Sequence, residues 1–145
     1  MQGNIDQPLR VGCENQQRDE YMSAELQYKL VLQKQPKNAA ANHLMGLLKF
    51  KQGLFDEAVP FLKLALEIKP EEAQNWISYI DVLIKLKAIK DAQNMLDQAK
   101  EKGAKGKVFE NLQEKIKQSN QANGIEGFEY EKPIEVERNF PVHDN

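Results

Sequence analysis

Apolar residues recur along this chain at a fixed offset of 34 residues. The recurring positions are Tyr21, Phe55 and Ile89; Ala24, Ala58 and Ala92; Tyr28, Leu62 and Leu96; and Val31, Ala65 and Ala99. Two prolines, Pro36 and Pro70, keep the same offset. A repeat of this length with two amphipathic helices in each unit predicts a stack of helical hairpins. The alanines fit this prediction, because small side chains let neighbouring helices approach closely.

Caps and breakers divide the repeats into about six helices. The expected helices cover about residues 18–35, 38–52, 55–69, 72–87, 89–102 and 106–118. Asn38 is a suitable N-cap for the second helix, and Gly53 can supply the left-handed residue that ends it. Strand-like alternation is almost absent before residue 125. The sequence therefore predicts an all-α fold, an antiparallel helix-hairpin solenoid.

The repeats also set the expected domain organisation. We predict an irregular N-terminal segment over 1–17, a half repeat over 18–37, full repeats over 38–71 and 72–104, a capping helix over 106–118, and an acidic tail over 119–145. Six acidic residues against Lys132 and Arg138 give the tail a charge of −4. With no helical signal, the tail is expected to be extended or disordered. It could dock in a groove as an internal ligand or link to a further domain.

Composition excludes several classes of function. The 145 residues are 41% hydrophobic and 29% charged, as in a soluble globular protein. A net charge of −2 gives no bulk electrostatic reason to expect nucleic acid or an anionic membrane as a partner. Cys13 is the single cysteine, so an internal disulfide cannot form. No apolar run is long enough to span a membrane, and we expect a cytoplasmic location.

No catalytic or metal-binding motif is present in the sequence. Gly103 and Gly106 lack the strand and the Ser or Thr of a phosphate-binding loop. The two histidines, His43 and His143, do not cluster with Cys13 as zinc ligands would. Trp76 lies at a repeat position and is expected to pack in the core rather than serve as a stacking platform. We therefore predict a protein that is not an enzyme and needs no cofactor or metal.

Residues 18–104 resemble the tetratricopeptide repeat family in their small and large positions. In the unit AAANHLMGLLKFKQGLFDEAVPFLKLALEIKP, the matching residues are Gly46, Gly53, Phe55, Ala58, Leu62, Ala65 and Pro70. In AQNWISYIDVLIKLKAIKDAQNMLDQAKEKGA, they are Trp76, Leu83, Ala92, Leu96 and Ala99. Met45, Lys49 and Ile80 depart from the family pattern. Because Ile80 replaces a small residue, we expect the helices over 72–87 and 89–102 to be spaced more widely.

The resemblance implies that the first helix of each unit lines a concave groove for an extended peptide. The corresponding positions are His43, Leu44, Leu47, Phe50 and Lys51 in one helix, and Ile77, Ser78, Asp81, Ile84 and Lys85 in the other. Chaperone-tail receptors of this family clamp a terminal carboxylate, but His43 and Leu47 occupy two of the clamp positions, so that activity is not expected. These residues favour an apolar-anchored segment, unless they simply pack within or beside the repeats.

An apolar stripe on the first helix is a second candidate surface. Met22, Leu26 and Leu30 are spaced as one helix face, whereas Lys90 and Asn94 occupy equivalent positions in the fifth helix. Such a stripe usually marks an interface. The residues that could cover it are 5–17, the tail, a second copy of the chain, or a partner.

The function predicted from these features is binding of a peptide or protein in the groove, without catalysis. The alternative is the substrate-presenting arm of an enzyme, because the texture of residues 75–103 is similar to N-terminal repeats of bacterial glycosyltransferase or sulfotransferase-like proteins. A homodimerising element built on the stripe is a third reading.

Overall fold

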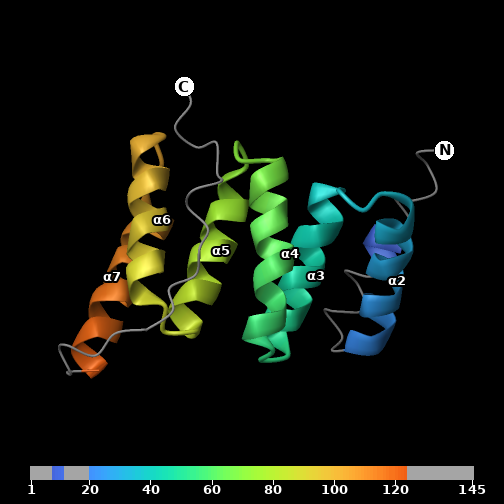
Figure 1. Cartoon of the computed structure of the whole chain (residues 1–145), viewed down its shortest axis with the longest axis horizontal. Coiled ribbons are helices and arrows are strands. Elements are labelled where there is room, and N and C mark those ends of the chain that lie inside the picture. Colours follow the sequence, from blue (N-terminus) through green and yellow to red (C-terminus); the bar gives the residue numbers. More distant parts are fainter. Residues whose placement is uncertain (1–7, 12–19, 124–145) are drawn as a thin grey trace. The chain divides into compact units, whose positions relative to one another are not determined.

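The structure is a computed structural model that describes residues 8–11 and 20–123. A short helical turn covers residues 8–11, and no strand occurs among the described residues. The longer helices are α2 (Tyr21–Lys34), α3 (Ala39–Lys51), α4 (Phe55–Ile68), α5 (Ala73–Lys85), α6 (Ile89–Glu101) and α7 (Lys107–Asn123) (Figure 1). The chain divides into two compact units, Met1–Ile68 and Lys69–Asn145. The prediction of an all-α hairpin fold is confirmed.

In the first unit, α3 packs against both α2 and α4. Ala24, Tyr28, Met45 and Leu48 form a buried cluster between α2 and α3, and Leu9 from the N-terminal turn packs against it. The antiparallel pair α3–α4 is close because Gly46 faces Leu62. A Cβ atom built at Gly46 would lie 2.5 Å from the Cγ atom of Leu62, well inside contact distance. The glycine is therefore required by packing rather than by backbone conformation.

In the second unit, α7 packs against both α5 and α6. The fully buried side chains include Tyr79, Ile80, Leu83, Met95 and Leu96. The backbones of α3 and α4 lie close over more of their length than those of α5 and α6. This difference fits the wider spacing expected from Ile80.

The 34-residue register appears in burial and in hydrogen bonding. Every alanine at a recurring position is at most 1% exposed. The Asn42 Nδ2–H donates to the Pro36 carbonyl at 3.1 Å, and 34 residues later the Trp76 Nε1–H donates to the Pro70 carbonyl at 2.7 Å. Two different side chains thus perform the same task, closing the turn before each first helix. Asn38 caps α3 as predicted, its Oδ1 accepting from the Ala41 N–H at 2.8 Å.

Three local expectations were wrong. Residues 8–11 are helical, although the segment 1–17 is predicted to be irregular; the rest of that segment lies outside the described residues. α7 runs to Asn123, so residues 119–123 are not part of an extended tail. On α7, the spacing of Val108, Leu112 and Ile116 predicts one apolar face that Phe109 can widen. The buried face instead consists of Phe109, Leu112 and Ile116, and Val108 is 48% exposed. The remaining tail, residues 124–145, lies outside the described residues.

Candidate functional site

The expected groove residues of α3 lie mainly at half-buried positions. His43, Leu44, Leu47 and Phe50 are partly buried, and Lys51 is exposed. Leu44 packs against the core cluster of the first unit. Phe50 meets Phe55 of α4 edge-on, with the ring centroids 5.2 Å apart. Leu44 and Phe50 therefore have packing partners inside their own unit, whereas Lys51 faces solvent.

The expected residues of α5 are split between the core and a cleft. Ser78 and Ile84 are buried, Ile77 and Asp81 are half-buried, and Lys85 is exposed. A cleft of about 470 Å³ lies in the second unit beside α5 and α7. Its lining residues are Asp81, Ile84, Lys85, Lys87, Lys115, Gln118 and Ser119. The structure thus brings three of the residues expected from α5 into one concave site, which we call the α5–α7 cleft.

The α5–α7 cleft is basic. Among its described lining residues, three lysines face a single carboxylate, that of Asp81. Lys115 Nζ lies 3.3 Å from Asp81 Oδ1, so this pair links α7 to α5 and neutralises one lysine. Lys85 and Lys87 have no carboxylate partner in the part of the chain that the structure describes. Two uncompensated ammonium groups therefore border a cleft floored by Ile84.

The cleft residues on α7 were not predicted from the sequence; they are Lys115, Gln118 and Ser119. The 34-residue repeat could have indicated them, because residue 106 stands 34 positions after residue 72, where the preceding unit begins its first helix. The segment over 106–118 is therefore in register with the first helix of a third unit, and not only a cap. Lys87 was missed because the turn between α5 and α6 was not considered as part of the groove.

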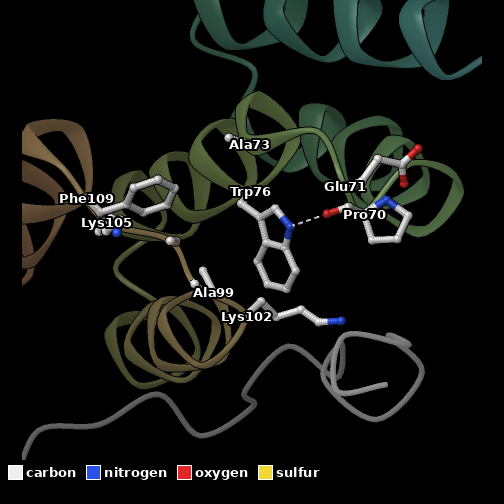
Figure 2. Close-up of a pocket in the computed structure, with 10 residues that line it drawn as sticks. Pro70, Glu71, Ala73, Trp76, Ala99, Lys102, Lys105 and Phe109 are labelled. Atoms are coloured by element: carbon white, nitrogen blue, oxygen red, sulfur yellow. Dashed lines mark hydrogen bonds between the residues drawn. The ribbon is translucent and has the colours of Figure 1, made fainter. Parts of the chain in front are cut away.

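A second cleft, of about 580 Å³, lies in the same unit (Figure 2). It is lined by Pro70, Glu71, Ala73, Trp76, Ala99, Lys102, Gly103, Ala104, Lys105 and Phe109. Trp76 is only 4% exposed, and its indole N–H is directed to the Pro70 carbonyl (Figure 2). The burial and the hydrogen bond fit the core role predicted for Trp76. We call this site the Trp76 cleft.

An ion-pair network joins the three helices of the first unit. Lys49 Nζ on α3 lies 3.3 Å from Glu25 Oε2 on α2 and 3.4 Å from Glu57 Oε1 on α4. Burial acts to raise the pKa of Glu25, but Lys49, and to a smaller degree Lys29, outweigh it, so the pKa of this carboxyl falls below its ordinary value. Lys49, one of the three positions that depart from the pattern of the resemblance, links the helices of this unit.

The stripe on α2 is exposed. Met22, Leu26 and Leu30 are 85%, 58% and 43% exposed. The turn at 8–11 does not cover this stripe, because Leu9 packs against the buried face of α2, beside Tyr28 and Val31. An intermolecular role for the stripe stays a prediction from the sequence.

Metal ligands do not gather among the residues that the structure describes: no three His, Cys, Asp or Glu side chains are placed to share an ion. Cys13 and His143 lie outside those residues. Within the same ranges, every helix is too short or too polar to cross a membrane.

Comparison with known proteins supports the repeat. Residues 49–116 match the family model of the tetratricopeptide repeat. The fold is similar to the crystal structure of the Sgt2 TPR domain from Aspergillus fumigatus, with a TM-score of 0.74, 16% sequence identity, and coverage of 91% of this chain and 89% of that one. A comparison with curated proteins gave no match. At this identity the structural likeness shows the fold alone.

Proposed function

We propose that this protein is a non-catalytic interaction module that binds an extended segment of another protein, and that the α5–α7 cleft is a contact site for that segment. The tetratricopeptide match over 49–116 and the fold support the general class, because such repeats serve as interaction modules. The location rests on one observation: Asp81, Ile84 and Lys85, three residues expected to face the ligand, line a cleft that α7 completes.

The size and chemistry of the cleft suit part of a peptide. Its volume of about 470 Å³ lies in the range of ordinary ligand sites, roughly 300–1,000 Å³. Ile84 offers an apolar floor, while the lysines, Gln118 and Ser119 offer polar groups at the walls. One apolar side chain of a ligand could be seated with its neighbours held at the rim. The face of α3 with His43, Leu47 and Lys51 is proposed as a further contact.

The test is to select a random displayed peptide library against the full chain and measure binding of the enriched peptides. Gln118→Trp should fill the cleft from an exposed position without disturbing the core. Asn120→Trp is the matched control, because it makes a similar change on α7 outside the cleft lining. We expect Gln118→Trp to weaken binding at least about tenfold, a difference of ~1.4 kcal/mol, and Asn120→Trp to leave it unchanged.

Failure to enrich any peptide, or equal binding by the two tryptophan variants, would count against the cleft. The alternative from the sequence, an arm of a glycosyltransferase or sulfotransferase-like enzyme, stays a prediction, as do the cytoplasmic location, the homodimer, and the absence of nucleic-acid and membrane partners.

A further inference from the structure

Lys87 has a backbone conformation that lysine rarely adopts. Its φ is +65°, the only positive φ of a non-glycine residue in the described part of the chain. In the preceding hairpin the equivalent residue is Gly53, with φ +80°. Both residues make the same turn bond, because the Gly53 N–H donates to the Phe50 carbonyl at 3.0 Å and the Lys87 N–H to the Ile84 carbonyl at 2.9 Å. The turn therefore needs a left-handed residue, and glycine would meet that need with less strain.

The folded structure shows no packing reason for a lysine at this position. Lys87 is exposed, and no salt bridge with a described residue involves it. Backbone strain often accompanies a functional side chain, and the inference runs from the observed outlier to the function. The second observation is the location, because Lys87 lines the α5–α7 cleft together with Lys85.

We propose that Lys87, with Lys85, makes the α5–α7 cleft selective for an extended partner segment that carries acidic side chains around an apolar anchor. This inference rests on the proposed function and adds the chemistry of the ligand. Charge complementarity favours this occupant, because Lys115 is paired with Asp81 and the ammonium groups of Lys85 and Lys87 have no carboxylate partner among the described residues. Carboxylates of the ligand would supply it through charge-assisted hydrogen bonds.

The experiment uses the full chain and two probe peptides, both blocked at their termini. One alternates glutamate with leucine, and the other alternates glutamine with leucine. Blocked termini remove the terminal carboxylate as a source of charge. We expect the glutamate peptide to bind at least about tenfold more tightly at low salt, and to lose this advantage as salt is raised.

Variants then assign the selectivity to the lysines. Lys87→Gly and Lys85→Gln should each weaken the glutamate peptide roughly fivefold and leave the glutamine peptide unchanged. Lys87→Gly should also raise the urea midpoint of unfolding, because it relieves the strained φ. A residue with a purely structural role would not move affinity and stability in opposite directions. The charge-matched control is Lys102→Gln with Lys105→Gln, both in the Trp76 cleft, which should change neither affinity.

The outcomes separate this inference from the proposed function. Equal affinity for the two probes, or enriched library peptides that bind the cleft without acidic residues, would overturn the inference and leave the proposed function standing. If no peptide binds at the cleft, both the inference and the proposed function are wrong. If the glutamate peptide binds only after the tail glutamates are changed to glutamine, the tail of this chain is the occupant, and the proposal of a partner segment is wrong.

Discussion

The two full hairpins, α3–α4 and α5–α6, have the same register but solve three local problems with different residues. Asn38 caps α3 with its side chain, whereas Glu72 before α5 makes no side-chain cap. Gly46 lets α3 approach α4, whereas the equivalent Ile80 fills the space inside the second hairpin. At the turns, Gly53 and Lys87 occupy the same left-handed position.

These differences show that the 34-residue register is kept in both hairpins even though the two helices of each hairpin pack differently. The turn carbonyl, the buried alanines and the backbone turn bonds are retained in both hairpins, so these features define the fold. The residues that vary set how closely the two helices pack and how stable the turn is. The first hairpin has the more favourable residue at the cap and at the turn, and the second retains a lysine beside a cleft.

The largest expected effect on stability comes from shortening the buried side chain of Ile80 in the α5–α6 hairpin. Ile80→Ala should lower the free energy of unfolding by roughly 2–5 kcal/mol, because a fully buried side chain leaves a cavity. Urea unfolding followed by the fluorescence of Trp76, the single tryptophan, reports on this unit. The exposed Val108→Ala is the control and should shift stability by less than about 0.5 kcal/mol. Equal small effects would show that Ile80 does not set the packing.

Adding a methyl group between the closely packed helices α3 and α4 should have the next largest effect on stability. Gly46→Ala should cost roughly 1–3 kcal/mol, because its methyl group overlaps Leu62. Helix propensity alone predicts the opposite sign, a gain of about 1 kcal/mol. Urea unfolding followed by far-UV circular dichroism measures the sign. Adding Leu62→Ala should reduce the cost of Gly46→Ala in a double-mutant cycle; a stabilised Gly46→Ala variant would contradict the close approach.

A side-chain N-cap for α5, which Glu72 does not supply, can be introduced by substitution at this position. Glu72 has φ −89° and ψ 115°, close to the −74° and 113° of Asn38, so its backbone already has the cap conformation. Glu72→Asn should therefore add about 0.5–1 kcal/mol to the free energy of unfolding. Glu72→Ala is the control, since it removes the same charge without adding a cap. If the two variants unfold at the same urea concentration, the cap geometry is not equivalent.

The smallest effect concerns the ion-pair network of the first unit. The pKa of Glu25 is lowered from 4.5, so its pairing with Lys49 stabilises the fold at neutral pH and is lost as the pH falls through the lowered pKa. Lys49→Met should reduce the pH dependence of stability between neutral pH and about pH 3 by less than ~1 kcal/mol, because the pair is partly exposed. Lys37→Met is the control, with no expected change in slope, because Lys37 is exposed and forms no ion pair with a described residue. An undiminished slope in Lys49→Met would show that the pair contributes nothing.

Much of the fold could be predicted from the sequence, because the 34-residue periodicity is present both in the buried positions and in the turns between helices. The buried alanines and the Asn38 cap follow from local patterns that tertiary packing reinforces. The end of α7 was missed because the asparagines of the tail were read as breakers, although asparagine can continue a helix when its side chain faces solvent, as the exposed Asn120 does. The two faces of α7 were also misjudged at Val108, since one sequence does not tell which of two adjacent apolar residues turns inward.

The candidate site was less predictable. The residues on α5 follow from the resemblance to tetratricopeptide repeats, but the cleft exists only because α7 places Lys115, Gln118 and Ser119 opposite them. The left-handed conformation of Lys87 has no signal in its own sequence, because glycine is the residue that usually marks such a turn. Comparing the two hairpins at Gly53 and Lys87 reveals it.

Peptide binding at the α5–α7 cleft can be tested directly with a two-dimensional ¹H–¹⁵N NMR map of the full chain with an enriched library peptide. We predict that the shifted amides belong to Asp81–Lys87 and to Lys115–Ser119, and that the indole N–H of Trp76 in the other cleft stays in place. Shifts confined to the α2 stripe of Met22, Leu26 and Leu30, or to the Trp76 cleft, would contradict the assignment of the α5–α7 cleft as the binding site.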